Sequence, residues 1–427
     1  MNTEIFEVEN FMKSRPHVVI LGAGATVAAI PHGDKNGKKS SVMDGFIEKL
    51  GMSDIIKNTN IQTKSNNLED IYTELSERDD CVEIINILDQ KIRDYFSELA
   101  IPDNPNIYDF IILSLRNKDI IATFNWDPLL IQAYNRVSQI TNNLPDLAFL
   151  HGNVCVGYCR NHKQGGAIPN KCGECGEYFD HVKLLYPIKN KKYSEDPYIK
   201  DNWKALRNAL KRAYYVTIFG YSAPTTDAEA IAILQEAWGI SEERNFEQFE
   251  IIDIKEEKEI IKSWSPFIHT HHYDIHKNFF DSSLANYPRR TTDVLFDRTM
   301  NCKIINPLRK FDPSMSWEEV KDLIDSLVSE ETDQKDNFLS SDIVHQDDMP
   351  MVTKTLPVQP NNKFTLDKLI EKLLDAKKHG VLGTDPVNIT YLNINGDKEY
   401  KITNVIAINT HEVDERGGSV TLMIDME

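Results

Sequence analysis

The residues with the clearest chemical signature are four metal-ligand candidates in one short stretch. Cys159 and His162 form one pair. Cys172 and Cys175 form a second pair, separated from the first by nine residues. Two such pairs on short turns are typical of a zinc ribbon, whose four ligands surround the ion and leave no position for water. We therefore expect a zinc ion that stabilises the fold, with nearby Cys155 competing with His162 for the fourth position.

A glycine-rich turn follows the first apolar segment. Residues 17–22 read His-Val-Val-Ile-Leu-Gly, a pattern typical of a strand buried in a parallel sheet. The turn Gly22-Ala23-Gly24 is a candidate nucleotide contact. Glycine lets a backbone approach a pyrophosphate, and the helix that follows offers free N–H groups. Because Val27 replaces the third glycine of the usual fingerprint, a simple tight turn is the alternative interpretation.

Polar side chains also end the next two apolar segments. Asn125 and Asp127 follow residues 119–123, and His151 follows residues 147–150. The carboxyl ends of parallel strands face the ligand crevice. There, an asparagine can orient a water or a ribose hydroxyl, an aspartate can fix the loop, and a histidine can act as a general base. A turn rich in Asx residues and a structural histidine are the alternatives.

Two later apolar segments end in further candidate contacts. Residues 214–219 are followed by Gly220 and Ser222, and the segment 249–254 contains Asp253. An aspartate at the end of a strand can accept a hydrogen bond from a ribose hydroxyl. Taken singly, none of these residues specifies a function.

The elements that must position these residues alternate between strand and helix. Apolar residues recur three and four apart in 68–99 and again in 203–213, between the apolar strands. This alternation predicts an α/β fold with a doubly wound parallel sheet, here spanning residues 1–305. The zinc ribbon is an insert at about residues 152–190.

The pattern changes after residue 305. Between Phe311 and Pro350 there are 12 acidic residues and 2 lysines, so we expect 306–358 to be an acidic linker with one short helix. Residues 359–427 have the pattern of a small α+β module. It comprises a helix at 365–380 and strands at 387–394, 400–408 and 420–424.

The charge balance excludes some classes of protein. The chain has 48 basic and 66 acidic residues and a net charge of −18, so we expect no direct nucleic-acid binding. The sequence has no apolar run of about 18 residues, so we expect no membrane span. The first 15 residues carry Glu4, Glu7 and Glu9 in place of a signal peptide, which predicts a cytoplasmic protein.

Taken in order, these motifs resemble the sirtuin family. Gly-Ala-Gly, Thr-x-Asn-x-Asp, His-Gly, a zinc ribbon and Gly-x-Ser occur in that order between about Val18 and Asp253. The resemblance implies a Rossmann-like domain with a small zinc module, NAD bound between them, and cleavage of the nicotinamide–ribose bond. The spacing from His151 to Cys159 resembles that of the family, which favours His162 over Cys155 as a ligand.

The resemblance also implies roles for individual residues. Ala23, Gly24 and Thr26 would line the phosphate loop. Asn125 and Asp127 would organise nicotinamide and ribose, and His151 would be the base. Ser222 and Asp253 would contact riboses of the cofactor. With Gly22 and Gly220, these residues make up the expected NAD site.

One segment departs from the sirtuin deacylases. They follow the glycine loop with Ile-Pro-Asp-Phe-Arg, whereas this chain has Ile30-Pro31-His32-Gly33 and then Asp-Lys-Asn-Gly-Lys. That segment resembles the sirtuin-like domains of bacterial anti-phage defence systems, which often hydrolyse NAD. We therefore expect an NAD glycohydrolase that acts in defence by depleting NAD.

Two alternatives remain open at this stage: an NAD-dependent protein deacylase, and a non-catalytic sensor of NAD or ADP-ribose. Because uncontrolled NAD hydrolysis would kill a cell, we expect regulation through a homo-oligomer. We also expect the C-terminal module to dock a partner protein.

Overall fold

The computed structural model describes residues 2–40, 45–186, 196–223, 227–240, 243–268 and 272–332, together with three C-terminal strands. The chain divides into two compact units, Met1–Asp348 and Met349–Glu427. Each unit is described by itself.

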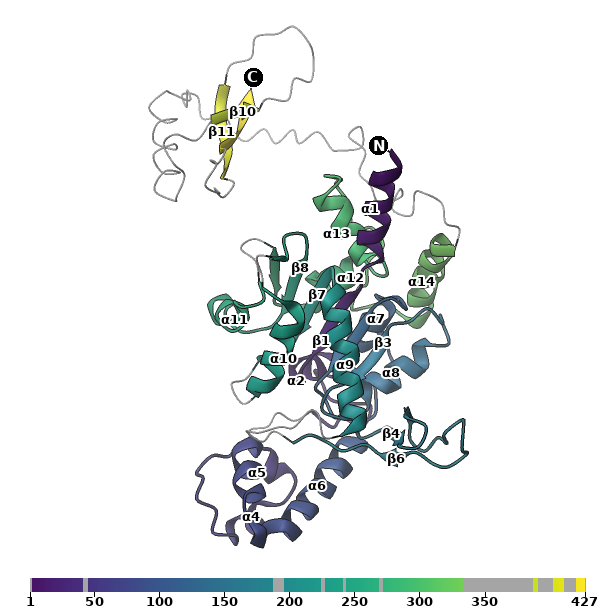
Figure 1. Cartoon of the computed structure of the whole chain (residues 1–427), viewed down its shortest axis with the longest axis vertical. Helices are drawn as coiled ribbons and strands as arrows, with labels where there is room; N and C mark the ends of the chain where they lie inside the picture. The colour runs from purple at the N-terminus through teal and green to yellow at the C-terminus, as the bar shows by residue number, and fades with distance from the viewer. Residues whose placement is uncertain are drawn as a thin grey trace. The chain divides into compact units, whose positions relative to one another are not determined.

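The first unit is built on a parallel sheet of six strands (Figure 1). They are β1 (His17–Leu21), β2 (Ile120–Thr123), β3 (Asp146–Phe149), β7 (Tyr215–Phe219), β8 (Gln248–Ile252) and β9 (Tyr273–His276). The order β3-β2-β1-β7-β8-β9 is the doubly wound order, and it reverses direction between β1 and β7. This confirms the predicted fold class. The edge strand β9 was not predicted.

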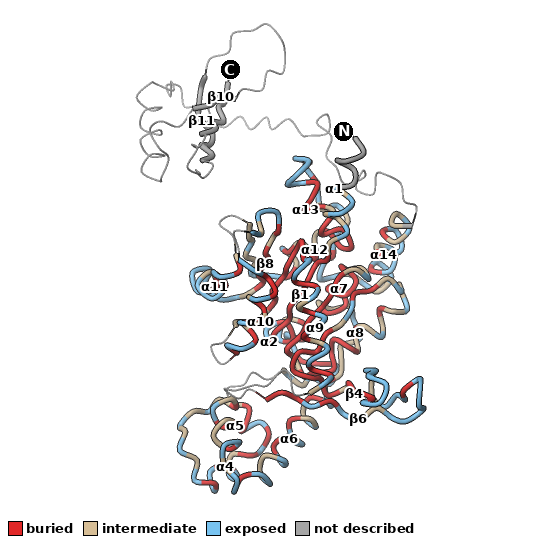
Figure 2. Tube along the Cα trace, viewed as in Figure 1, coloured by how far each residue is buried: buried red, intermediate tan, exposed pale blue. Residues whose placement is uncertain are grey.

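Helices cover the sheet on both faces. They are α2 (Ala23–Ala29), α7 (Ile107–Leu113), α8 (Leu129–Val137), α9 (Pro197–Arg212), α10 (Ala228–Trp238) and α11 (Glu257–Trp264). Strands β1, β2 and β7 are buried along their whole lengths, as the central strands of a sheet covered on both sides must be (Figure 2). Their continuous apolar sequences follow from this burial.

A helical lobe projects from the loop between α2 and α7. It contains α3 (Phe46–Lys49), α4 (Ser53–Lys57), α5 (Leu68–Ser76), the 3₁₀ turn η1 (Asp79–Cys81) and α6 (Val82–Ser97). The segment 68–99, which has a helical pattern in the sequence, therefore forms two helices. Arg78 separates them, donating hydrogen bonds to Asp80 and to the carbonyl oxygen of Thr59. In Figure 1 this lobe lies at the same end of the unit as the insert between β3 and α9.

That insert is a small antiparallel sheet of β4 (Val156–Cys159), β5 (Gln164–Ala167) and β6 (Asp180–His181). The strand β4 lies in the middle and ends at the first candidate zinc ligand, Cys159. This matches the zinc-ribbon insert that the cysteine spacing predicts.

The opposite end of the first unit holds α1 (Asn2–Ser14), the 3₁₀ turn η4 (Phe279–Asp281), α12 (Ser283–Asn286), α13 (Thr291–Thr299) and α14 (Trp317–Thr332). Val320, Ile324 and Leu327 of α14 are buried in the main core. This helix was expected in the acidic linker, but its apolar stripe packs on the α/β unit.

The second unit contains β10 (Val387–Thr390), β11 (Ile402–Thr410) and β12 (Val420–Met426) in the order β10-β12-β11. Strand β12 pairs parallel with β10 and antiparallel with β11. These strands agree with the predicted ones, while the helix expected at 365–380 lies outside the described residues. Within the described part of the chain, no helix is long and apolar enough to cross a membrane.

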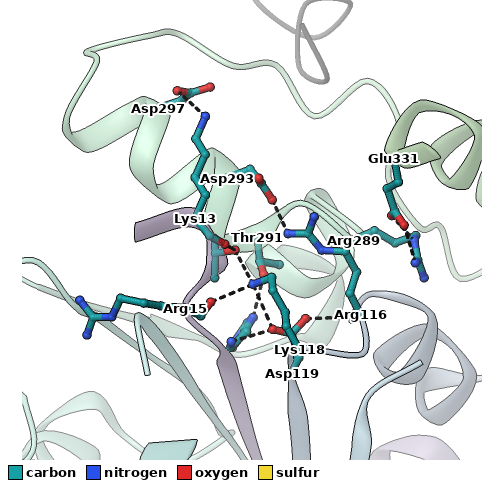
Figure 3. Close-up of polar contacts among 12 residues, drawn as sticks. Lys13, Arg15, Arg116, Lys118, Asp119, Arg289, Thr291, Asp293, Asp297 and Glu331 are labelled. Atoms are coloured by element: carbon teal, nitrogen blue, oxygen red, sulfur yellow. Dashed lines mark hydrogen bonds and ion pairs between the residues drawn. The ribbon is translucent and has the colours of Figure 1, made fainter. Parts of the chain in front are cut away.

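Buried ionic contacts close the amino edge of the six-stranded sheet (Figure 3). The Asp119 carboxylate accepts hydrogen bonds from the backbone of His17 and of Arg116, both at 2.8 Å. Lys118 donates to the carbonyl oxygen of Arg15 at 2.8 Å and to Thr292 at 2.9 Å. Further ion pairs join Arg116 to Asp293 and Arg289 to Glu331, so α13 and α14 are tied to this edge.

The imidazole of His17 is part of a hydrogen-bonded chain inside the sheet. Its Nε2 lies 2.8 Å from the hydroxyl of Thr217, and its Nδ1 lies 2.8 Å from that of Thr291. Thr217 donates its one hydroxyl proton to Glu250 at 2.9 Å. The proton of the neutral ring must therefore sit on Nε2, and Nδ1 accepts from Thr291. Burial lowers the pKa of His17 to about 4.

This burial predicts a pH dependence of stability. His17 has a pKa of about 4 in the folded protein and of about 6.5 in the unfolded chain. Between these two pH values, the two states bind different numbers of protons. The unfolded chain binds more, so the free energy of unfolding falls as the pH drops through this window, by up to about 3 kcal/mol. In urea titrations, His17→Gln should show a shallower fall than wild type. His32→Gln, at an exposed site, should not. Equal slopes for wild type and His17→Gln would contradict this account.

Candidate functional site

Two loops meet in backbone contact where the strand order reverses. The amide of Gly22 donates to the carbonyl oxygen of Phe219 at 3.0 Å, and that of Gly24 donates to the carbonyl oxygen of Gly220 at 2.9 Å. A Cβ on Gly22 would lie 2.5 Å from the oxygen of Gly220, and one on Gly24 would lie 2.7 Å from its Cα. Gly22 and Gly24 are therefore required because a side chain at either position would break this contact between the loops.

The loop after β2 is bound to the loop after β1 by side chains. Asn125 donates from Nδ2 to the carbonyl oxygen of Gly22 at 2.8 Å and to the hydroxyl of Thr26 at 3.0 Å. Thr26 in turn donates to Oδ2 of Asp127 at 2.8 Å. The amide nitrogen of Asn125 is thus held by the glycine loop, so Oδ1 is the atom that Asn125 can offer to a ligand.

Tyr108 of α7 completes this buried cluster. Because Thr26 gives its proton to Asp127, its oxygen accepts the hydroxyl proton of Tyr108 at 2.7 Å. Burial raises the pKa of the Asp127 carboxyl and raises that of Tyr108 well above its usual value. Sequence reasoning missed Tyr108. Its helix begins with a capping box of Asn106 and Asp109, but no sequence signal places its hydroxyl at Thr26.

His151 follows β3 and is held from several sides. Its ring contacts the ring of Phe124 edge to face, with centroids 4.8 Å apart, and its carbonyl oxygen accepts from the amide of Leu185 at 2.9 Å. Gly152 has φ of +78°, and a Cβ there would lie 2.3 Å from the carbonyl oxygen of Lys183. The backbone at His151 is therefore held at the carboxyl edge of the sheet, and its ring packs against Phe124.

An open cleft of about 280 Å³ lies over this edge, within the described residues. It brings together most of the residues proposed from the sequence, namely Gly22, Ala23, Thr26, Asn125, Asp127, His151, Gly220 and Ser222. Side chains that sequence reasoning left unassigned also line it: Ser40, Asn67, Glu69, Phe96, Phe124, Trp126, Tyr221 and Asp227. The rings of Phe124 and Tyr221 stack, with centroids 4.1 Å apart.

Two of the predicted cofactor residues do not line the cleft. The amide of Gly24 is used in the contact with Gly220. Asp253, at the end of β8, accepts a hydrogen bond from the backbone of Lys255 at 2.9 Å, which is an Asx turn. Gly24 thus shapes the loop. A cofactor contact of Asp253 stays a prediction.

The predicted zinc ligands form a cluster. The sulfur atoms of Cys159, Cys172 and Cys175 and a nitrogen of His162 all lie within 4.8 Å of one another. Cys159 Sγ lies 3.8 Å from Cys175 Sγ and 3.5 Å from Nδ1 of His162, which is itself 3.6 Å from Cys172 Sγ. Zn–S bonds of about 2.3 Å and Zn–N bonds of about 2.0 Å in a tetrahedron require separations of about 3.8 and 3.5 Å. The four side chains therefore fit a zinc ion, and Cys155 is outside the cluster.

Aromatic contacts connect the segment after the zinc module to the candidate site. After β6 the chain reaches Tyr186, whose ring stacks on Tyr72 of α5 at 4.5 Å and contacts Trp126 at 5.3 Å. Arg93 of α6 donates to the carbonyl oxygen of Val182 at 2.9 Å. The metal cluster thereby supports the segment that contacts both the helical lobe and His151.

Substitution of single side chains tests which residues bind the zinc ion. We expect the purified chain to hold one zinc ion, and Cys175→Ser or His162→Ala to lose it because three ligands bind the ion poorly. Cys155→Ser is the matched control and should keep the metal. Metal content measured by mass spectrometry decides between them, and zinc loss in Cys155→Ser alone would overturn the assignment.

The loop contact predicts the effect of adding one methyl group. Gly220 and Gly37 both have positive φ, of +62° and +80°. A Cβ on Gly220 would lie 2.3 Å from the amide nitrogen of Ala25, whereas one on Gly37 meets no atom within 4 Å. Gly37→Ala should cost about 1 kcal/mol of unfolding free energy, and Gly220→Ala about 3 kcal/mol. Equal losses in denaturant titrations would argue against a tight loop contact.

Comparisons with known proteins give distant structural likenesses. A Sir2 homologue in complex with NAD is 13% identical, with 70% of this chain and 94% of that chain covered and a TM-score of 0.32. A structure of Sir2 bound to an acetylated peptide is 14% identical, with coverages of 71% and 98% and a TM-score of 0.30. No family model matches the chain, and no curated protein is significantly similar to it. Similarity this low transfers no activity, ligand or residue role.

Proposed function

We propose that this chain is an NAD glycohydrolase that releases nicotinamide and ADP-ribose. The observation that carries the proposal is that Asn125 and His151 line one cleft at the carboxyl edge of a doubly wound sheet, where the strand order reverses. Ligands of such sheets bind at this position. The sirtuin resemblance of the motifs supports NAD as the ligand.

The loops after β1 and β7 are the expected binding elements for the cofactor. Ala23 and Thr26 come from the first loop, and Gly220 and Ser222 from the second, and all four line the cleft. Because α2 has only seven residues, its dipole adds little, and recognition depends on these loop atoms. NAD would lie across the reversal point, with its nicotinamide end towards Asn125 and His151.

In the proposed reaction, the bond between C1′ of the ribose and N1 of nicotinamide breaks, and nicotinamide leaves with the electron pair. Water adds its oxygen to C1′ and releases one proton. Aromatic walls beside the nicotinamide ring would disfavour its positive charge and so favour its departure as neutral nicotinamide. Phe96, Phe124 and Trp126 supply such walls.

The site residues divide the remaining work. Oδ1 of Asn125 orients the nicotinamide amide or the water, since its Nδ2 is held by Gly22. Asp127 is 3% exposed and bonded to Thr26, so it holds the loop. His151 accepts a proton from a ribose hydroxyl as charge develops at C1′ and returns it to that oxygen once water has added. Zinc, with four protein ligands, supplies structure to the segment behind His151.

The biological setting is a further part of the proposal. The resemblance of the segment at 33–38 to sirtuin-like defence domains supports a role against phage, through depletion of NAD in the cytoplasm. Regulation would come from a homo-oligomer and from a partner protein docked on the C-terminal unit, which is compact by itself.

Replacing the two central residues tests the proposal. Asn125→Ala and His151→Ala should each lower kcat for nicotinamide release by at least about 100-fold, because each removes a group that contacts the reacting bond. Asn135→Ala and His32→Ala make the same chemical changes at exposed positions and should match wild type. Nicotinamide is followed by chromatography, and NAD binding by calorimetry.

The outcomes separate the competing functions. Wild-type rates in both site variants would refute the residue assignment. NAD binding without cleavage in the wild-type chain would point to a sensor. Nicotinamide release that requires an acetylated peptide, with deacetylated peptide formed in proportion, would point to a deacylase.

A further inference from the structure

One wall of the cleft comes from outside the sheet. Asn125, His151 and Gly220 belong to loops at the carboxyl edge of the strands. Glu69 instead begins the helix α5 of the helical lobe, yet it lines the same cleft. An acidic residue of the lobe therefore lines the same space, of about 280 Å³, as the two residues assigned to bond cleavage.

The three carboxylates that line the cleft in the described residues differ in their surroundings. Asp127 is 3% exposed and accepts hydrogen bonds from Thr26 and from the backbone of Leu129. Asp227 is 5% exposed and accepts the hydroxyl proton of Tyr221 at 3.1 Å. Glu69 is half-buried, so among the three it is the carboxylate that water reaches most readily.

The backbone that carries Glu69 is held in place. Its amide donates to Oδ1 of Asn67 at 2.8 Å, and its carbonyl oxygen accepts from the hydroxyl of Thr73 at 2.7 Å. The amide of Asn67 donates to Ser65 at 3.1 Å. These bonds fix the backbone at the start of α5, from which the Glu69 side chain extends at the cleft wall. A carboxylate carried by a fixed backbone at the wall of an open cleft can act as a general base.

We infer that Glu69 is the base that activates water in the proposed NAD hydrolysis, an inference that rests on the proposed function. Once the C1′–N1 bond breaks, the ribose is an oxocarbenium ion that needs a nucleophile at C1′. The Glu69 carboxylate takes one proton from water as the water oxygen bonds to C1′, and then passes that proton to solvent. The role distinguishes hydrolysis from acyl transfer, in which an acyl oxygen attacks without a base.

A purely structural role for Glu69 is the competing explanation. Acidic residues in the first turn of a helix stabilise it through the helix dipole, and α5 carries Glu69 and Asp70 there. Asp70 is exposed and does not line the cleft. Asp70→Asn therefore removes the same charge from the same helix turn and leaves the cleft unchanged.

The experiment uses the full chain and measures ADP-ribose formation from NAD. Glu69→Gln should lower kcat by at least about 100-fold with KM changed less than about threefold, while Asp70→Asn matches wild type. Sodium azide needs no deprotonation to attack C1′. With Glu69→Ala, azide should restore NAD consumption and yield ADP-ribosyl azide, detected by mass spectrometry, whereas Asp70→Ala should gain nothing.

The contrary results are distinct from one another. Hydrolysis by Glu69→Gln within threefold of wild type would overturn the inference and leave the proposed function intact. Lost hydrolysis in Glu69→Gln with no azide rescue of Glu69→Ala would also overturn it, because Glu69 would then act on folding or on bond cleavage. No NAD cleavage by the wild-type chain would instead refute the proposed function itself.

Discussion

The site depends on the hydroxyl of Thr26, where the loops after β1 and β2 are joined. This one oxygen donates to Asp127 and accepts from Asn125 and from Tyr108, all within the protein interior. A buried polar cluster of this kind is costly unless every member is paired, and pairing makes it rigid. The orientation of the Asn125 amide follows from this pairing and from the hydrogen bond that its nitrogen donates to the carbonyl oxygen of Gly22.

The two edges of the sheet have different tasks. At the amino edge, Asp119, Lys118 and Arg116 are paired with one another or with neighbouring helices, which closes that edge with protein. At the carboxyl edge, the contacts join loop to loop and leave the cleft between them and the helical lobe. The loop after β3 is included, because Asn153 donates to the carbonyl oxygen of Asp127 at 2.6 Å. Ionic contacts thus close the amino edge, while the loop contacts at the carboxyl edge set the geometry of the site.

Much of this arrangement is predictable from the sequence, because buried parallel strands impose continuous apolar runs and their carboxyl ends must share one edge. The residues that follow those runs, such as Asn125 and His151, therefore fall in one place. The zinc ligands are predictable because their spacing is local. Tyr108, Glu69 and Phe96 were not found. Glu69 and Phe96 line the cleft because the helical lobe packs against the sheet, and the hydroxyl of Tyr108 on α7 meets Thr26 only through tertiary packing. Strand β9 was missed because Tyr273–His276 is a short, half-buried edge strand among polar residues.

The central claim is that the cleft breaks the glycosidic bond of NAD with water as acceptor. The most direct measurement is a time course of purified full-length protein with NAD alone, in which nicotinamide and ADP-ribose are quantified by chromatography. The account predicts that both products appear in equal amounts as NAD disappears. Intact NAD at every time point, while calorimetry shows that NAD is bound, would contradict it.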